Sequence, residues 1–197
     1  MQLQRRLVRA FDAWLSRREG VRPFTSDPRV ILRIQPGSAS WDISLPTGKI
    51  ARGSPVLFIH LWSERIPAVP AAGPDLAWAR SAQRLMIYSF RSLALHARED
   101  ADLRTTTAVG GHIAHLRPRG PHGGRALVER LGFHLFPYHR PLGWLGEFSE
   151  NFYAWWLMWA FNAPSAARHP LPGMRRMEFW MSTEEFLLRF LDRHERR

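Results

Sequence analysis

The chain has 197 residues, enough for one domain that buries roughly 70% of the surface that its unfolded form exposes. With 45% hydrophobic and 23% charged residues, the composition is that of a globular protein and excludes disordered and fibrous classes. The absence of cysteine excludes a disulfide scaffold, a thiol nucleophile and a thiolate metal site.

Positive charge is the main departure from an average composition. The formal net charge is +11, and every basic residue other than Lys49 and the histidines is an arginine, whose planar fork suits phosphate and carboxylate. This predicts an acidic partner: an anionic small molecule, a lipid headgroup or nucleic acid. Nucleic acid is the least favoured, because the aromatic residues cluster at core-like spacings instead of between the arginines. The alternative interpretation is an arginine-rich surface without a focused partner.

Residues 1–19 predict a basic amphipathic helix. The apolar side chains recur at helical spacing, at Leu7, Phe11, Trp14 and Leu15. Asp12 and Arg17 interrupt the apolar stretch, so the segment does not have the pattern of a signal peptide. Residues 2–18 are expected either to dock on the chain's own domain or to lie on an anionic membrane.

The main domain is expected over residues 28–192. Strands are predicted at residues 30–34, 41–45 and 56–62, and the last of these is apolar on both faces, as a central strand should be. Asp75 is the expected N-cap of a long helix that reaches about residue 97.

The second half alternates between strands and helices. Strands are predicted at residues 107–116, 133–138 and 177–181, a short helix at 124–131, and a final helix opened by the capping-box pair Ser182 and Glu185. These elements predict a mixed α/β fold of the α+β type, with a single mixed sheet covered by helices.

An aromatic helix is predicted before the last strand. Its helical spacing is set by Phe148, Phe152, Trp155 and Trp159. Because Tyr153, Trp156 and Leu157 fill its other side, we expect this helix to be largely buried. The longest apolar run, residues 152–161, is about half of the ~20 residues that a membrane span needs. The expected location is the cytoplasm or the periphery of the inner membrane.

His60, Trp62 and Glu64 form the first candidate ligand site. Alternation places all three on one face of a strand at its carboxyl end, where open α/β sheets tend to bind ligands. The alternative is a buried histidine bonded to the backbone beside a surface glutamate. A zinc site would require His60, His112 and His134 to meet on neighbouring strands, which no local spacing demands. Neither a metal nor another cofactor is predicted.

The glycine-rich segment 117–125 is the second candidate site. It places three guanidinium groups and several glycines between a strand and a helix: Arg117, Arg119, Gly120, Gly123, Gly124 and Arg125. A bound phosphate is expected there, and a solvated loop is the alternative. No motif identifies catalytic residues, so the sequence leaves open whether the protein is an enzyme, and its oligomeric state.

The segment 117–136, which ends in ALVERLGFHLF, resembles fragments of the GNAT acetyltransferase superfamily. That resemblance implies a small acyltransferase that uses an acyl-CoA. The final glycine of the superfamily's R-x-x-G-x-G/A pattern falls on His122, and the strand and helix that separate its two motifs do not fit between them.

A broader resemblance covers residues 28–192. The Leu32-Arg33-Ile34 strand, the HLWSE segment at residues 60–64, Leu131-Gly132-Phe133 and Trp180-Met181-Ser182 resemble the YkoP-like domain of uncharacterised bacterial proteins. Members of that family are stand-alone proteins or modules attached to polysaccharide deacetylases. The resemblance implies a setting in envelope polysaccharide or glycolipid metabolism. Together with the positive charge and the segment 117–125, it leads us to expect an accessory domain that binds an anionic ligand. The deacetylase's own metal motif is absent from this sequence.

Overall fold

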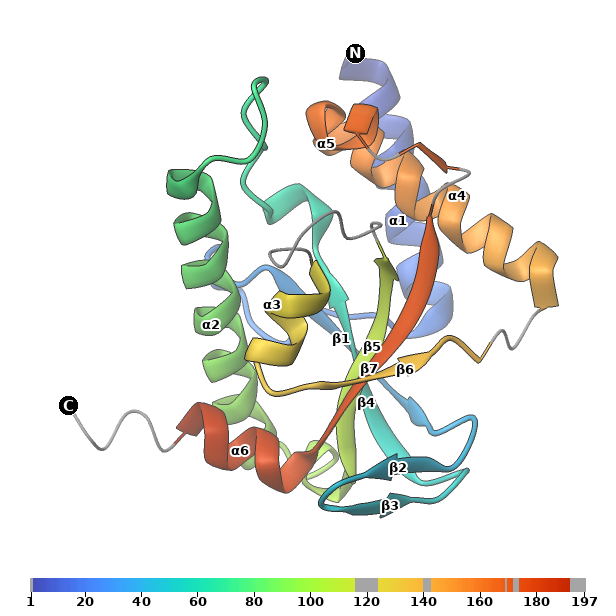
Figure 1. Cartoon of the computed structure of the whole chain (residues 1–197), viewed down its shortest axis with the longest axis vertical. Helices are drawn as coiled ribbons and strands as arrows, with labels where there is room; N and C mark the ends of the chain where they lie inside the picture. The colour runs from blue at the N-terminus through green and yellow to red at the C-terminus, as the bar shows by residue number, and fades with distance from the viewer. Residues whose placement is uncertain (1, 116–123, 140–142, 169, 172–173, 192–197) are drawn as a thin grey trace.

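The computed structural model describes residues 2–115, 124–139, 143–168, 170–171 and 174–191. Its centre is a five-stranded mixed sheet in the order β1-β4-β5-β7-β6. The strands are β1 (Leu32–Ser38), β4 (Pro55–Leu61), β5 (Ala108–His115), β7 (Arg175–Ser182) and β6 (His134–Pro137). Helices cover both faces of this sheet, so the predicted mixed α/β fold is confirmed (Figure 1).

The long helix α2 (Leu76–Glu99) joins the two parallel strands β4 and β5. Its N-cap is the predicted one, because the Asp75 carboxylate accepts a hydrogen bond from the Trp78 amide at 2.7 Å. With α3 (Gly124–Arg130) and α6 (Thr183–Leu191), α2 covers one face of the sheet over a core that includes Leu93, Phe133 and Phe186. This cluster is the largest of the three that the described residues form.

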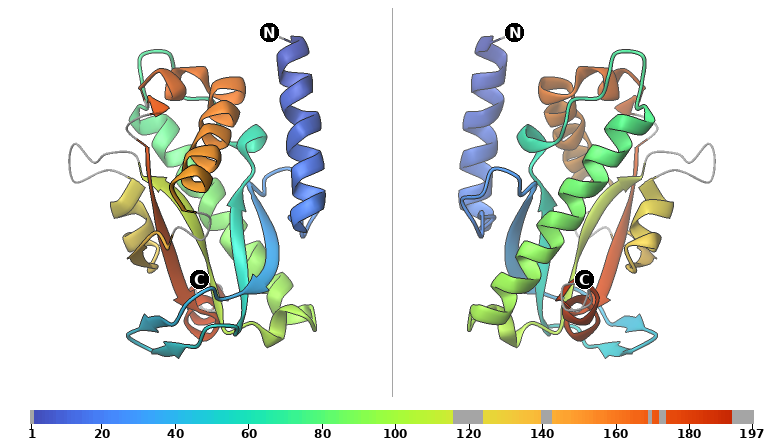
Figure 2. Two further views of the ribbon diagram at one scale, coloured as in Figure 1. Left: turned by 90° about the vertical axis from the view of Figure 1, so that its right-hand side faces the viewer. Right: turned by 90° about the vertical axis from the view of Figure 1, so that its left-hand side faces the viewer.

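The opposite face is covered by α1 (Gln2–Glu19), α4 (Gly143–Phe161) and the hairpin β2 (Ile43–Leu45) to β3 (Gly48–Ile50), with α5 (Ala163–Arg168) beside α4. Figure 2 shows α2 and α4 on opposite sides of the sheet. The expected strand at residues 41–45 therefore does not join the main sheet. It is shortened to β2 and folds over the sheet, where Ile43 packs with Val56, Ala108 and Trp180.

The two parallel strands pair over a short length. The paired residues run from Val56–Ala108 to Phe58–Gly110, although β4 continues to Leu61 and β5 to His115. Figure 2 shows β4 and β5 separating toward their carboxyl ends. Gly110 is required here, because a Cβ at this position would lie 2.3 Å from the Trp180 ring and 2.2 Å from the Phe179 carbonyl oxygen.

A buried ion pair docks α1 on the sheet. The Arg33 guanidinium on β1 donates to both carboxylate oxygens of Asp12, at 2.8 and 3.1 Å, and also to Ser16 Oγ at 2.9 Å. Tyr153 on α4 donates its hydroxyl proton to the same Asp12 carboxylate. Nearby, Val8 packs with Leu157 and Ala160. Residues 2–18 therefore dock on the domain, as expected in one of the two arrangements, and contact with a membrane stays a prediction.

The ion pair turns the predicted apolar side of α1 outward. Val8 and Asp12 are buried, whereas Leu7, Phe11 and Trp14 are exposed. The expectation that the aromatic helix is largely buried is wrong, because only a small part of α4 contacts the rest of the protein. Helix α4 packs through a narrow side made of Gly146, Asn151, Leu157 and Ala160. Five of its large apolar side chains remain exposed: Trp144, Leu145, Phe148, Phe152 and Trp159.

None of the described helices has both the length and the apolar character needed to cross a membrane.

Replacing Asp12 with alanine should destabilise the fold by about 3–5 kcal/mol, because it leaves the buried Arg33 charge without a counter-ion. Replacing both partners, as Asp12→Leu with Arg33→Met, should restore most of the stability. Urea unfolding followed by circular dichroism measures both effects. The control is Asp42→Ala in the exposed Lys49–Asp42 pair, which should change stability little. A loss for Asp12→Ala no larger than that of the control would contradict this role of the buried pair.

Candidate functional site

His60 lies on β4 beside Arg33 of β1, on the sheet face that α1 and α4 cover. Its Nε2 atom lies 2.8 Å from the Gln35 side-chain oxygen, and the Gln35 amide nitrogen donates to the Glu19 carbonyl oxygen at 2.8 Å. A backbone carbonyl can only accept, so the Gln35 amide group has one orientation and its oxygen faces His60. His60 must therefore carry its proton on Nε2, which leaves a lone pair on Nδ1.

His60 is neutral at physiological pH. Burial, aided by the positive charge of Arg33, lowers the pKa of His60 to about 4. A neutral imidazole whose tautomer is fixed by an amide can act as a hydrogen-bond acceptor or a general base. The predicted alternative of a backbone-bonded histidine is not what the structure shows, since the partner of His60 is a side chain.

Trp62 and Glu64 do not continue the strand. Strand β4 ends at Leu61, and residues Ser63–Arg65 form the 3-10 helix η1. The Trp62 ring lies between two guanidinium groups, at 3.6 Å from Arg65 and 5.6 Å from Arg33. Glu64 forms an ion pair with Arg9 on α1, at 3.3 Å. The expected continuous strand from His60 to Glu64 is therefore interrupted, because β4 ends at Leu61, and each of the three side chains has its own partner. Their joint role as a ligand site stays a prediction.

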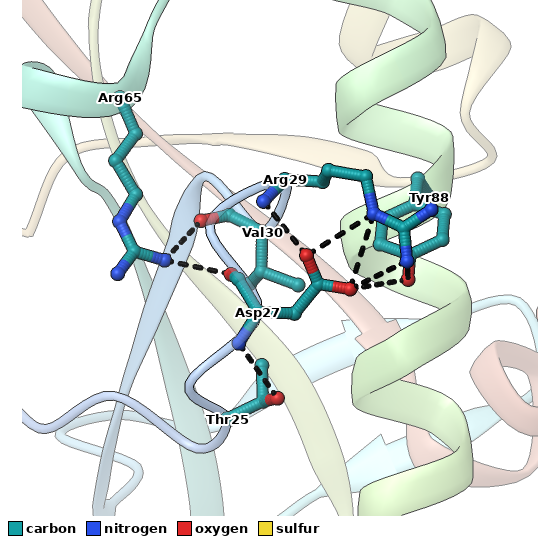
Figure 3. Close-up of polar contacts among 6 residues, drawn as sticks. All are labelled: Thr25, Asp27, Arg29, Val30, Arg65 and Tyr88. Carbon is teal, nitrogen blue, oxygen red and sulfur yellow. Dashed lines mark hydrogen bonds and ion pairs between the residues drawn. The ribbon is translucent and has the colours of Figure 1, made fainter.

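A polar cluster fixes this turn in place (Figure 3). The Arg65 guanidinium donates to the carbonyl oxygens of Asp27 and Val30, at 2.8 and 3.0 Å. The Asp27 carboxylate in turn accepts from Arg29 and from the Tyr88 hydroxyl on α2. The hydrogen bonds from Arg29, followed by that from Tyr88, hold the pKa of Asp27 well below its usual range. The segment after β4 is thus tied to the turn before β1 and to α2.

His112 on β5 lies on the same face as His60. Its ring is 5.9 Å from the Phe58 ring and 5.2 Å from the Tyr138 ring, measured between centroids. The nearby carboxylates already have partners. Glu178 accepts from the Trp41 and Trp180 indoles, both at 2.9 Å, and Glu150 binds Arg176 at 3.2 Å. Among the described residues, His112 has ring contacts but no hydrogen bond.

The three histidines do not meet. His134 lies on the edge strand β6, which pairs with β7, so β7 separates it from His112 on β5. Within the described parts of the chain, no group of three or more histidine, aspartate or glutamate side chains is placed to hold a metal ion.

The glycine-rich candidate site falls largely outside the described residues. This applies to Arg117, Arg119, Gly120 and Gly123. Gly124 begins α3, as predicted, and Arg125 is exposed with its Nε 3.0 Å from the Glu129 carboxylate one turn later. The phosphate site expected at residues 117–125 stays a prediction.

Three other arginines converge on the helical face of the molecule. A cavity of about 160 Å³ lies between α2, α3 and α6. It is lined by three arginines, one glutamine and four apolar residues: Arg91, Arg130, Arg189, Gln83, Ile87, Leu127, Leu131 and Phe190. No described carboxylate forms an ion pair with any of the three arginines. We call this the arginine pocket.

Gly132 holds one of these arginines against the backbone. The Arg189 guanidinium donates to the Arg130 carbonyl oxygen at 2.9 Å. A Cβ on Gly132, which has a φ of +94°, would lie 2.7 Å from the Arg189 Cζ atom. The glycine therefore provides both the left-handed backbone that ends α3 and the space that the guanidinium fills.

Sequence analysis did not identify the arginine pocket. Its arginines come from three helices that are far apart in the chain, and they follow no local motif. The one signal in the sequence is Arg130, which directly precedes the Leu131-Gly132-Phe133 segment.

Searches found no family model, no curated protein and no solved structure that matches this chain.

The titration of His60 can be measured directly. Its pKa is about 4 in the folded state and 6.5 in the unfolded state, so the unfolded chain binds more protons between these values. The free energy of unfolding should therefore fall as the pH drops from 6.5 to 4, by up to about 3 kcal/mol from this group. His60→Gln should remove that part of the pH dependence. An NMR titration in which the His60 imidazole protonates near pH 6.5 would contradict the assignment.

Proposed function

We propose that this protein is an accessory domain that binds an anionic ligand, and that a phosphate or carboxylate group of the ligand lies in the arginine pocket. The observation that carries the proposal is the convergence of Arg91, Arg130 and Arg189 on one cavity without a described acidic partner. Like charges repel, so three guanidinium groups kept close together favour an anion between them. The envelope setting, polysaccharide or glycolipid metabolism, rests on the YkoP-like resemblance.

The volume of the pocket limits the size of the group that it can bind. A volume of about 160 Å³ is well below the roughly 300–1,000 Å³ typical of sites that enclose a whole drug-sized molecule. It suits one phosphate or carboxylate group, with the rest of the ligand outside. Ile87, Leu127 and Phe190 supply an apolar lining that strengthens charge interactions by lowering the local dielectric constant. The fork of each guanidinium supplies paired donors.

Calorimetric titration with inorganic pyrophosphate tests the pocket. Each of Arg91→Gln, Arg130→Gln and Arg189→Gln should weaken binding by about tenfold, as expected for the loss of a charged hydrogen bond. The triple variant that combines these three substitutions should lose most of the binding. Its control is Arg52→Gln with Arg98→Gln and Arg104→Gln, which removes the same charge from exposed positions elsewhere. Equal losses in the two triple variants would mean that pyrophosphate responds to net charge alone and would overturn the proposed site.

The second candidate function is an acyltransferase that uses an acyl-CoA. The observation that favours it is the separation of the parallel strands β4 and β5 toward their carboxyl ends, where ligands of open α/β sheets bind. His60 and His112 lie toward this end of the strands, and neutral His60 keeps a lone pair on Nδ1 for accepting a proton from an acceptor amine or hydroxyl.

Acetyl-CoA distinguishes the two functions. An accessory domain should show at most a weak titration with acetyl-CoA, through its phosphates, and lose it in the triple Arg91, Arg130 and Arg189 variant. Saturable binding of acetyl-CoA that survives in this variant and is lost in His60→Gln would favour the acyltransferase instead.

A further inference from the structure

Helices α1 and α4 together expose a large apolar surface. We call it the aromatic surface, and define it by Leu3, Leu7, Phe11, Trp14, Trp144, Leu145, Phe148, Phe152 and Trp159. The exposed fractions of these side chains range from 39% to 75%. Along α4, Leu145, Phe148, Phe152 and Trp159 follow one another at spacings of three, four and seven residues, and Trp144 precedes Phe148 by four, so they form one stripe on the side opposite the one that packs on the sheet.

The surface is continuous between the two helices. The Phe11 ring of α1 lies 5.7 Å from the Trp156 ring of α4, and the Trp156 ring lies 6.5 Å from that of Phe152. On α1, Phe11 also contacts Trp14 at 5.7 Å. Six aromatic side chains of about 200 Å² each, roughly half exposed, give a patch on the order of 600 Å², which matches or exceeds the largest patch of a typical monomer. An exposed apolar patch of this size indicates a surface that binds another molecule.

Cations border the aromatic surface. Arg6, Arg17 and Arg18 of α1 are exposed, and none of them forms an ion pair with a described residue. The Arg18 guanidinium lies 5.6 Å from the Trp14 ring, so one of these charges is held directly at the patch. Tryptophan, phenylalanine and arginine side by side are the composition of helices that lie at a membrane interface.

We infer that the aromatic surface docks on an anionic lipid membrane, with its aromatic side chains at the boundary between headgroups and acyl chains. Arg6, Arg17 and Arg18 then contact lipid phosphates. A second copy of this chain is a poorer fit, because pairing two such surfaces brings together the cationic α1 helices of two molecules that each carry a net charge of +11. An anionic membrane complements the apolar and the cationic parts at once.

Docking in this way leaves the arginine pocket accessible. The pocket lies between α2, α3 and α6, on the face of the sheet opposite α1 and α4. A membrane-bound molecule would therefore present the pocket away from the lipid surface. The inference about the membrane does not depend on the proposed ligand, because the aromatic surface and the arginine pocket consist of different residues on different faces.

Vesicle sedimentation tests the inference. The full chain should sediment with vesicles of phosphatidylcholine and phosphatidylglycerol, and much less with phosphatidylcholine alone. In the variant with Trp144→Gln, Phe148→Gln and Phe152→Gln, the affinity for these vesicles should fall by about tenfold or more, because three apolar side chains are lost from the interface. The variant with Arg6→Gln, Arg17→Gln and Arg18→Gln should lose about a hundredfold of the affinity for anionic vesicles.

Each variant has a matched control. For the aromatic side chains it is Leu76→Gln with Leu95→Gln and Leu188→Gln, three exposed apolar residues on α2 and α6 with exposed fractions of 42% to 66%. For the arginines it is the triple variant at Arg52, Arg98 and Arg104. Both controls should sediment like the wild type, and circular dichroism should show that all four variants are folded.

Two results would overturn the inference. One is sedimentation that is equally reduced in the test variants and their controls, or absent in the wild type at low salt. The other is a dimer of the wild type, detected by analytical ultracentrifugation without lipid, that the Trp144, Phe148 and Phe152 substitutions dissociate while their control does not. The second result would assign the aromatic surface to self-association.

Discussion

Arg33 lies on a sheet face that is shielded from water by α1, and a guanidinium in such a place requires a carboxylate. Asp12 is the one buried acid of α1, and its pairing with Arg33 determines which side of the helix faces the sheet. Tyr153 of α4 binds the same carboxylate, so the ion pair also positions the second helix. Two observations follow from this one contact: His60 is covered beside Arg33, and the aromatic side chains of α1 point outward.

The polar groups on this face are almost all engaged with one another. Glu178 has two indole donors, Arg176 has Glu150, and the Gln35 amide links His60 to the end of α1. Buried polar groups need partners of this kind, and such partners stabilise one arrangement of the sheet and its covering layers. His112 stands apart, because it is at the carboxyl side of the parallel pair with ring contacts alone among the described residues. Because His112 has no hydrogen-bond partner among the described residues, this face remains a candidate active site.

The molecule presents two cationic regions with different surroundings. The arginine pocket is a small concave space lined by three arginines and by apolar residues, which suits a single anionic group. On α1 the arginines border a wide convex patch of aromatic side chains, which suits an extended anionic surface. The two proposals thus rest on different arginines, on opposite faces of one sheet, and neither excludes the other.

The sequence by itself determined the mixed α/β fold, the Asp75 cap, the glycine-containing strand and the helix after residue 124, because hydrophobic periodicity and capping act over a few residues. It also determined that arginine carries the charge. Only the tertiary structure decided which arginines converge. Arg91, Arg130 and Arg189 are brought together by three helices, and the ion pair of Asp12 with Arg33 reverses the amphipathic pattern read from α1. These outcomes depend on contacts between residues far apart in the chain, which local spacing does not encode.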